Sequence, residues 1–159
     1  MNEMHGARIL IVDDEEGIRK SLRAVLEDKG CLVDIAENGQ EAITKSKTKF
    51  YNLALVDIRL PDMDGVTLLT EMRETTPKMA KIIITGYPSL DNAIAAVNKG
   101  ADGYIVKPFT MGNLLDTIKE HLQRQKEAKK YSEEKVKEYI ESRVEEQEAK
   151  PSRRRSKRA

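Results

Sequence analysis

The sequence predicts an α/β fold in which helices cover both faces of a five-stranded parallel sheet with the flavodoxin-like strand order 2-1-3-4-5. Between residues 8 and 122, short apolar runs alternate five times with segments whose apolar residues recur every three or four positions. Runs that lack polar alternation are typical of strands buried on both faces, as strands of parallel sheets are. Crossovers between parallel strands are right-handed, which favours a doubly wound sheet, and 2-1-3-4-5 is its common five-stranded order.

The first half of this region supplies three strands. Residues 8–12 form an apolar run that leads into two acids, and Gly30 is placed to end the helix that follows. Asn38 is placed to cap the second helix. From these patterns we expect strands at 8–12, 31–36 and 53–56, and a third helix whose apolar face holds Leu68, Leu69 and Met72.

The second half supplies the other two strands, at 81–85 and 103–106. Ser89 is placed to cap the helix between them. Thr110 is placed to cap the last helix, which carries apolar residues as far as Leu122. The alternation of strands and helices thus runs through the whole region.

The composition changes near residue 124, and we divide the chain into a globular domain at 1–124 and a charged helical extension at 125–159. The extension is rich in Glu, Lys, Arg and Gln, and Ser132 with the two acids after it favours the start of a new helical segment. Its apolar line is too thin to establish a coiled coil, although weak pairing between chains is compatible with it. That line consists of Val136, Ile140 and Val144.

The end of the chain is basic. Pro151 is expected to end the helix, and six Lys and Arg residues between Lys150 and Arg158 stand without an acid. The net charge is +1, so the chain without these six residues carries −5. A terminal charge block of this kind favours a disordered, solvated end. Contact with nucleic acid or an anionic membrane is an alternative that we do not favour, because the tail has no aromatic residue and no reading helix.

Several classes of protein are excluded by what the sequence lacks. No apolar run approaches the roughly 20 residues that cross a bilayer, and the N-terminal run 9–12 is too short for a signal peptide. The single Cys31 cannot form an internal disulfide, which suits a reducing compartment. We interpret Cys31 as a small apolar residue at the start of a strand, and we expect a cytoplasmic protein.

Polar side chains follow four of the five predicted strands at their carboxyl ends. Asp13 and Asp14 follow the first strand and Asp57 the third, while Thr85 ends the fourth and Lys107 follows the fifth. Taken singly, each has a plain explanation, since Asp caps helices and forms turns and Lys is often a solvated charge. Together they converge on the edge where open α/β sheets bind ligands, and this convergence predicts a functional site.

The residue types in this site suit metal-assisted phosphoryl chemistry. Three neighbouring carboxylates raise each other's pKa unless a cation lies between them. A site made only of oxygen ligands suits Mg²⁺ or Mn²⁺ rather than zinc. One carboxylate can then attack phosphorus as a nucleophile, while a Lys ammonium and a Thr hydroxyl bind the phosphoryl oxygens.

The chain resembles the receiver domain of two-component response regulators over residues 8 to about 122. The resemblance is carried by Val12-Asp-Asp-Glu15, Val56-Asp-Ile-Arg-Leu-Pro-Asp-Met-Asp-Gly65, Thr85-Gly86 and Lys107-Pro108-Phe109. It implies that Asp57 accepts a phosphoryl group from the phosphohistidine of a histidine kinase. It also implies a Mg²⁺ ion bound directly by Asp14, Asp57 and the backbone carbonyl of Arg59, and through water by Asp13.

The same resemblance assigns roles to the remaining site residues. Thr85 and Lys107 would contact the phosphoryl oxygens, Gly86 would leave room for them, and Lys107-Pro108 would be a cis peptide. Tyr104 would be the aromatic switch, although a partly buried packing role explains a Tyr at this position equally well. The domain would be a phosphoacceptor that promotes its own phosphorylation and dephosphorylation, rather than an enzyme. Its partners would be the kinase and a downstream effector, with a phosphorylation-dependent homodimer as a further option.

Other classes that use an α/β sheet fit less well. Haloacid-dehalogenase-type phosphatases have Asp-x-Asp after the first strand, whereas the acids here are adjacent and the exposed loop acid follows the third strand. A dinucleotide binder needs a glycine-rich first turn, and Asp13-Asp-Glu-Glu-Gly17 is acidic where the phosphates would approach; a P-loop is also absent. Because no recognisable output domain follows, we expect a stand-alone regulator that acts by protein contact.

Overall fold

The computed structural model describes residues 4–149 and contains one parallel sheet. The strand order is β2-β1-β3-β4-β5, which confirms the predicted topology. Neighbouring strands pair in register, so that Val12 lies opposite Val56 at the carboxyl ends of β1 and β3. The strands are β1 (Arg8–Val12), β2 (Leu32–Ala36), β3 (Leu53–Asp57), β4 (Ala80–Thr85) and β5 (Gly103–Val106).

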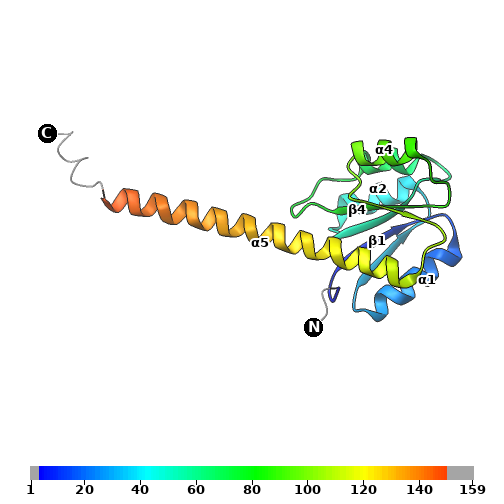
Figure 1. Ribbon diagram of the computed structural model, residues 1–159, viewed down its shortest axis with the longest axis horizontal. Helices are drawn as coiled ribbons and strands as arrows, with labels where there is room; N and C mark the ends of the chain where they lie inside the picture. Colours follow the sequence, from blue (N-terminus) through cyan, green and yellow to red (C-terminus); the bar gives the residue numbers. More distant parts are fainter. Residues whose placement is uncertain (1–3, 150–159) are drawn as a thin grey trace. The chain divides into compact units, whose positions relative to one another are not determined.

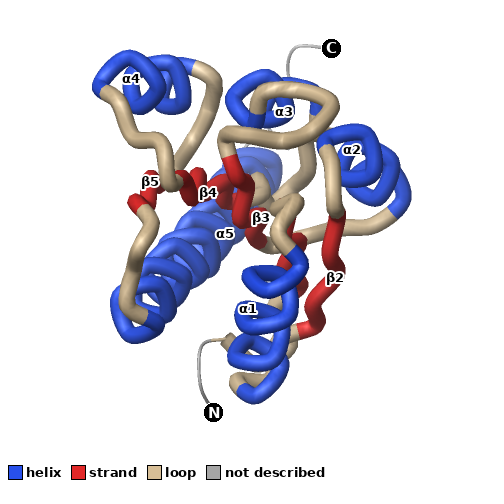
Figure 2. The backbone as a smooth tube through the Cα atoms, turned by 90° about the vertical axis from the view of Figure 1, so that its right-hand side faces the viewer, coloured by secondary structure: helices blue, strands red, loops and turns tan. Residues whose placement is uncertain are grey.

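Helices cover both faces of the sheet, as predicted (Figure 2). One face carries α1 (Glu16–Asp28) and the first part of α5 (Met111–Ala149). The other carries α2 (Gly39–Thr48), α3 (Gly65–Glu71) and α4 (Leu90–Asn98). Two apolar cores result, one on each side of the sheet.

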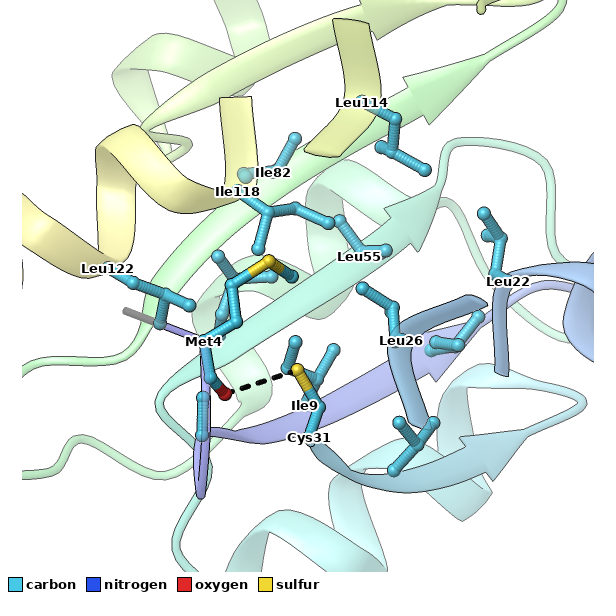
Figure 3. Close-up of a cluster of buried hydrophobic side chains, with 14 of the residues drawn as sticks. Met4, Ile9, Leu22, Leu26, Cys31, Leu55, Ile82, Leu114, Ile118 and Leu122 are labelled. Atoms are coloured by element: carbon cyan, nitrogen blue, oxygen red, sulfur yellow. Dashed lines mark hydrogen bonds between the residues drawn. The ribbon is translucent and has the colours of Figure 1, made fainter. Parts of the chain in front are cut away.

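The core beneath α1 and α5 is built from side chains that the helical spacing had marked as apolar. Leu22 and Leu26 of α1 and Leu114, Ile118 and Leu122 of α5 pack on the same face of the sheet and belong to one core with Ile9, Leu55 and Ile82 of the strands (Figure 3). Cys31 belongs to this core, and its thiol donates to the backbone oxygen of Met4 at 3.4 Å. Burial raises the pKa of the Cys31 thiol to about 11, so that the group is a neutral packing residue.

Three helices begin after the capping residues that the sequence predicts, and α1 ends at the predicted Gly30. The side chains of Asn38, Ser89 and Thr110 accept hydrogen bonds from backbone N–H groups three residues further on, at 2.8, 3.0 and 3.1 Å. Caps of this type are worth about 1 kcal/mol each. Gly30 and Gly100 follow α1 and α4 with φ of 88° and 102°, a backbone conformation that strains residues with a side chain.

Helix α5 differs from the prediction, because it runs without a break from Met111 to Ala149 (Figure 1). Ser132 lies inside the helix and does not start a new one. The physical reason is that the chain holds neither Gly nor Pro from residue 113 to residue 149, and Ser within a helix is only mildly unfavourable. Pro151 and the basic tail at 153–158 lie outside the described residues. Among residues 4–149, no helix is long and apolar enough to cross a membrane.

The chain divides into two compact units, Met1–Gln125 and Lys126–Ala159. The first unit ends at Gln125, whose side chain links α5 to the segments directly before β3 and β4. The Gln125 amide donates to the backbone oxygens of Asn52 and Lys78 at 2.9 and 2.7 Å, and it accepts from the Asn52 side chain at 3.0 Å. Asn52 in turn accepts from the backbone N–H of Arg8 at 2.9 Å. From Lys126 to Ala149 every residue of α5 is exposed.

Candidate functional site

Four acidic side chains gather at the carboxyl edge of the sheet. Asp13, Asp14, Glu15 and Asp57 each offer a carboxylate oxygen, and these oxygens lie within 4.8 Å of one another. We call these four residues the acid cluster. Asp13 and Asp57 are only 3 % and 5 % exposed, whereas Asp14 and Glu15 face solvent. The pairing of β1 with β3 brings the two buried acids together, because each follows directly on paired residues.

Lys107 joins the two buried acids. Its ammonium donates to Asp13 Oδ2 at 3.0 Å and to Asp57 Oδ2 at 3.2 Å. Burial by itself would lower the pKa of Lys107, but the hydrogen bonds and charges of Asp13 and Asp57 outweigh it and raise that pKa. Lys107 therefore stays charged in the folded protein. The Lys107–Pro108 bond is cis, as the resemblance implied.

The surroundings of Asp57 disfavour its ionised form and raise its pKa. Burial raises its pKa first of all, and the negative charge of Asp13 raises it further. Lys107 and the backbone N–H of Arg59, which donates to Asp57 Oδ1 at 3.2 Å, oppose this shift without cancelling it. Lys107 and this N–H thus do not fully offset burial and the Asp13 charge, and a further cation at this edge would favour the ionised carboxylate.

Thr85 lies on β4, the strand next to that of Asp57, and Tyr104 lies on β5, one strand further out. Thr85 is fully buried at the end of β4, and its hydroxyl oxygen accepts from the backbone N–H of Tyr87 at 3.0 Å. Its hydroxyl hydrogen is thereby left to another acceptor. Tyr104 of β5 pairs with Ile83 of β4 and is partly buried. Its buried hydroxyl has no hydrogen-bond partner among the described residues, which is uncommon for a native side chain.

The family model of the response regulator receiver domain matches residues 9–119 of the chain. The chain belongs to this family. The match spans the whole sheet and reaches into α5, so it includes every strand end that contributes to the site.

Two curated relatives place this receiver domain within longer proteins. ResD of Bacillus subtilis is 37 % identical over 126 residues, covering 78 % of this chain and 51 % of ResD. AtoC of Escherichia coli is 36 % identical over 118 residues, covering 74 % of this chain and 26 % of AtoC. The chain therefore spans between a quarter and a half of these relatives. Its stand-alone character stays a prediction.

Solved structures of similar chains agree in fold. A CheY-like receiver domain protein from Methanospirillum hungatei is 46 % identical with a TM-score of 0.74, covering 77 % of this chain and 98 % of that one. TrrA from Thermotoga maritima, solved in complex with Mg²⁺ and beryllofluoride, is 34 % identical with a TM-score of 0.65; the match covers 72 % of this chain and 98 % of TrrA.

The other acids of the loop after β3 in this receiver domain are structural. Asp62 accepts from the backbone N–H groups of Gly39 and Gln40 at 2.8 and 2.9 Å, which fixes the start of α2. Asp64 caps α3 by accepting from the Val66 N–H at 2.7 Å. Neither belongs to the acid cluster. Asp62 and Asp64 of the Leu60–Gly65 motif thus hold the loop, while Asp57 before it belongs to the acid cluster.

Two features of the receiver site were missed from the sequence. Glu15 was counted only as part of a motif, yet its carboxylate lies in the acid cluster and 3.7 Å from Lys107 Nζ. The signal was its place directly after Asp14, in the turn between β1 and α1. The second feature is the Arg59 guanidinium, which lies 3.5 Å above the Tyr87 ring. No pattern in the sequence pairs Arg59 with Tyr87.

Proposed function

We propose that the chain is a phosphoacceptor: Asp57 takes a phosphoryl group from a histidine kinase, with Mg²⁺ held in the acid cluster. The observation that carries this proposal is the bridge from Lys107 to Asp13 and Asp57 at the carboxyl edge of the sheet. It supports the proposal because a buried carboxylate, an ammonium and further carboxylate oxygens lie within one site, and phosphoryl transfer to a carboxylate uses groups of these kinds.

The donor set fits a hard divalent cation. Asp14 and Asp57 offer carboxylate oxygens, Arg59 offers its backbone carbonyl, and Asp13 would act through water. Bound Mg²⁺ would neutralise charge on the carboxylates and on the incoming phosphoryl oxygens. The raised pKa of Asp57, which burial and the Asp13 charge cause, supports this role for a cation.

The transfer itself uses groups of this chain. A carboxylate oxygen of Asp57 forms a bond to phosphorus while the phosphorus–nitrogen bond of the donor histidine breaks, and the imidazole leaves with the electron pair. Lys107 then exchanges its contact with Asp57 for a phosphoryl oxygen while keeping Asp13. Thr85 donates its free hydroxyl hydrogen to another phosphoryl oxygen. The product is an acyl phosphate, so that one group is taken up per chain without steady turnover.

The switch would follow from the movement of Thr85. When its hydroxyl turns to the phosphoryl group, Tyr104 can occupy the space and its unpartnered hydroxyl can find an acceptor. The exposed surface nearest to this change is apolar, because Leu90, Ile94 and Val97 of α4 are at least half exposed. Exposed apolar patches mark protein-binding surfaces. We propose that a downstream effector, or a second phosphorylated copy, reads this surface.

The test is labelling by acetyl phosphate and Mg²⁺, followed by intact-mass spectrometry. Wild type should gain one phosphoryl group, and Asp57→Asn should gain none, because an amide cannot act as the nucleophile. Asp62→Asn is the matched control, since it changes an acid of the neighbouring loop outside the acid cluster. Equal labelling of Asp57→Asn and wild type would remove Asp57 from this role. Steady release of product from p-nitrophenyl phosphate would instead favour a metal-dependent phosphatase.

A further inference from the structure

One face of the exposed part of α5 holds two apolar residues, Val136 and Ile140, with charged residues on either side of them. Six residues alternate at steps of four and three along this face, which places them on one side of an α-helix. We call them the seam: Lys129, Glu133, Val136, Ile140, Arg143 and Gln147. At its centre Val136 and Ile140 are 57 % and 55 % exposed, and they line a shallow depression on the helix surface.

We propose that the seam binds the same seam of a second copy of this chain, with the two helices antiparallel. Val136 of each copy would pack against Ile140 of the other, which gives two apolar layers at the centre of the pair. The helix requires such a partner to bury these side chains, because a helix that is alone gains nothing from exposed aliphatic residues. The direction follows from the charges that flank them.

A parallel pair in register would be repelled by its own seam. Every seam residue would then meet its own copy, so that Lys129, Glu133 and Arg143 would each face an identical charge. Like charges at facing positions of a coiled coil oppose pairing and act against the wrong orientation. The sequence of the seam thus disfavours the parallel arrangement at three of its six positions.

In the antiparallel pair, the same charged residues attract one another. When Val136 lies opposite Ile140, the residue three before Val136 meets the residue three after Ile140. Glu133 of each copy therefore lies opposite Arg143 of the other, which forms two symmetric ion pairs, one on each side of the apolar centre. One step further out, Lys129 meets the neutral Gln147.

The charge of the whole exposed segment points the same way. Residues 126–137 hold five lysines and three glutamates, whereas residues 138–149 hold five glutamates and one arginine. The first half is therefore net positive by two, and the second half net negative by four. Antiparallel pairing lays the positive half of one copy along the negative half of the other, while parallel pairing lays negative on negative. Without the seam residues Lys129, Glu133 and Arg143, the two halves still carry +2 and −5, so the residues outside the seam favour the same orientation.

The pair should be weak, because it has only two apolar layers and Arg143 has local contacts to give up. Its guanidinium lies 3.8 Å from Glu146, and its Nε donates to the Tyr139 hydroxyl at 3.1 Å. We therefore expect a dimer that forms with rising concentration and that salt weakens, since exposed ion pairs are screened. All its contacts lie in residues 126–149.

The decisive experiment is a charge exchange in the full chain, followed by sedimentation equilibrium at low salt. Mg²⁺ and phosphoryl donors are left out, so that pairing through a phosphorylated surface does not contribute. Glu133→Arg alone, or Arg143→Glu alone, replaces both ion pairs by like charges and should raise the dimer dissociation constant roughly tenfold. The double variant restores opposite charges in reverse order and should return within about twofold of wild type.

The controls separate this arrangement from the alternatives. Glu134→Arg makes the same charge change beside the seam and should leave the dissociation constant within about twofold of wild type. Helicity by circular dichroism shows whether each variant keeps α5. Two aspartates at the centre, Val136→Asp with Ile140→Asp, should abolish the dimer. The proposal is overturned if the wild type stays monomeric throughout, if this centre variant still dimerises, or if the double charge exchange fails to restore what the single changes lose.

Discussion

Lysine and carboxylate groups meet in two very different settings in this chain. At the carboxyl edge of the sheet, Lys107 contacts Asp13 and Asp57 with 15 % of its side chain exposed, and the pKa of Asp57 is raised by burial. In the exposed part of α5, Lys137 lies 4.0 Å from Glu141 with both side chains largely in water. Buried charges depend on one another for solvation, whereas exposed ones have water as a substitute. The carboxylates at the sheet edge therefore depend on Lys107 to compensate their charge, whereas the exposed pair on α5 does not depend on its own contact.

The largest effect should come from removing the ammonium at the sheet edge. Lys107→Met keeps the apolar stem but leaves Asp13 and Asp57 facing each other without a cation. We expect the free energy of unfolding in EDTA to fall by about 3 kcal/mol, because breaking a buried ion pair strands its partner charges. Lys137→Met should cost less than about 0.5 kcal/mol. Urea unfolding of both variants measures the contrast, and equal losses would mean that burial does not distinguish the two lysines.

Two glycines give a second contrast between the sheet edge and α5, through the space around each Cα atom. A Cβ at Gly65 would lie 2.1 Å from the backbone oxygen of Asp57, so that Gly65→Ala must displace the loop that follows Asp57. We expect it to destabilise the protein by about 2 kcal/mol and to reduce labelling by acetyl phosphate. A Cβ at Gly112 in α5 meets no atom of the described chain within 4 Å. Gly112→Ala should therefore stabilise by up to about 1 kcal/mol, and thermal unfolding of both variants tests the pair.

The parts that the sequence predicted are those set by periodicity and by strand ends. Asp13 and Asp57 could be placed together because parallel strands end at one edge of the sheet. Each of the two acids directly follows an apolar run, and these runs pair in the sheet. The caps at Asn38 and Ser89 were equally local. Such features depend on residues that are close in sequence or on the topology alone.

The parts that the sequence missed depend on side chains that meet across the fold. Gln125 reaches Asn52 and Lys78, which are 73 and 47 residues away, and no pattern marks such an amide. The continuity of α5 was missed for a different reason. Ser132 resembles a cap when it is seen alone, but a cap needs a chain that has left the helix before it, and nothing before Ser132 ends the helix.

A smaller effect, an increase in stability, is expected when the charge of Asp57 is removed. The raised pKa of Asp57 means that the folded protein holds this proton more tightly than the unfolded chain. Wild type therefore loses stability as the pH rises from the ordinary value of 3.8 through the raised folded value, and Asp57→Asn does not. Without Mg²⁺ at pH 7, the variant should be more stable by about 1 kcal/mol.

Added Mg²⁺ should reverse that order. It stabilises the folded state in proportion to its affinity, and the variant has lost one of the proposed ligands. Thermal unfolding in EDTA and in Mg²⁺ should therefore show a clear rise for wild type and little change for Asp57→Asn. A variant that is less stable than wild type in EDTA would show that the Lys107 contact outweighs the repulsion at this edge. A wild type that does not respond to Mg²⁺ would contradict the metal site.

The smallest effect should come from removing the exposed part of α5 altogether. A chain that ends at Gln125 keeps every strand, the acid cluster and the apolar residues of α5 that face the sheet. The removed residues are held by local pairs such as Lys135–Glu138 and Arg143–Glu146, which support a helix by only a few tenths of a kcal/mol each. We expect the free energy of unfolding to change by less than about 0.5 kcal/mol and labelling by acetyl phosphate to be unchanged.

Ending the chain one residue earlier gives this test its control. A chain that ends at Arg124 loses the Gln125 amide and leaves the backbone oxygens of Asn52 and Lys78 without its hydrogen bonds. It should still fold, but with a free energy of unfolding about 1 to 2 kcal/mol lower than that of the chain ending at Gln125. Urea unfolding of the two chains isolates this one side chain. If both are as stable as the full chain, Gln125 does not fasten α5 to the sheet; if the longer one is also destabilised, the exposed part of α5 contributes to the stability of the receiver domain.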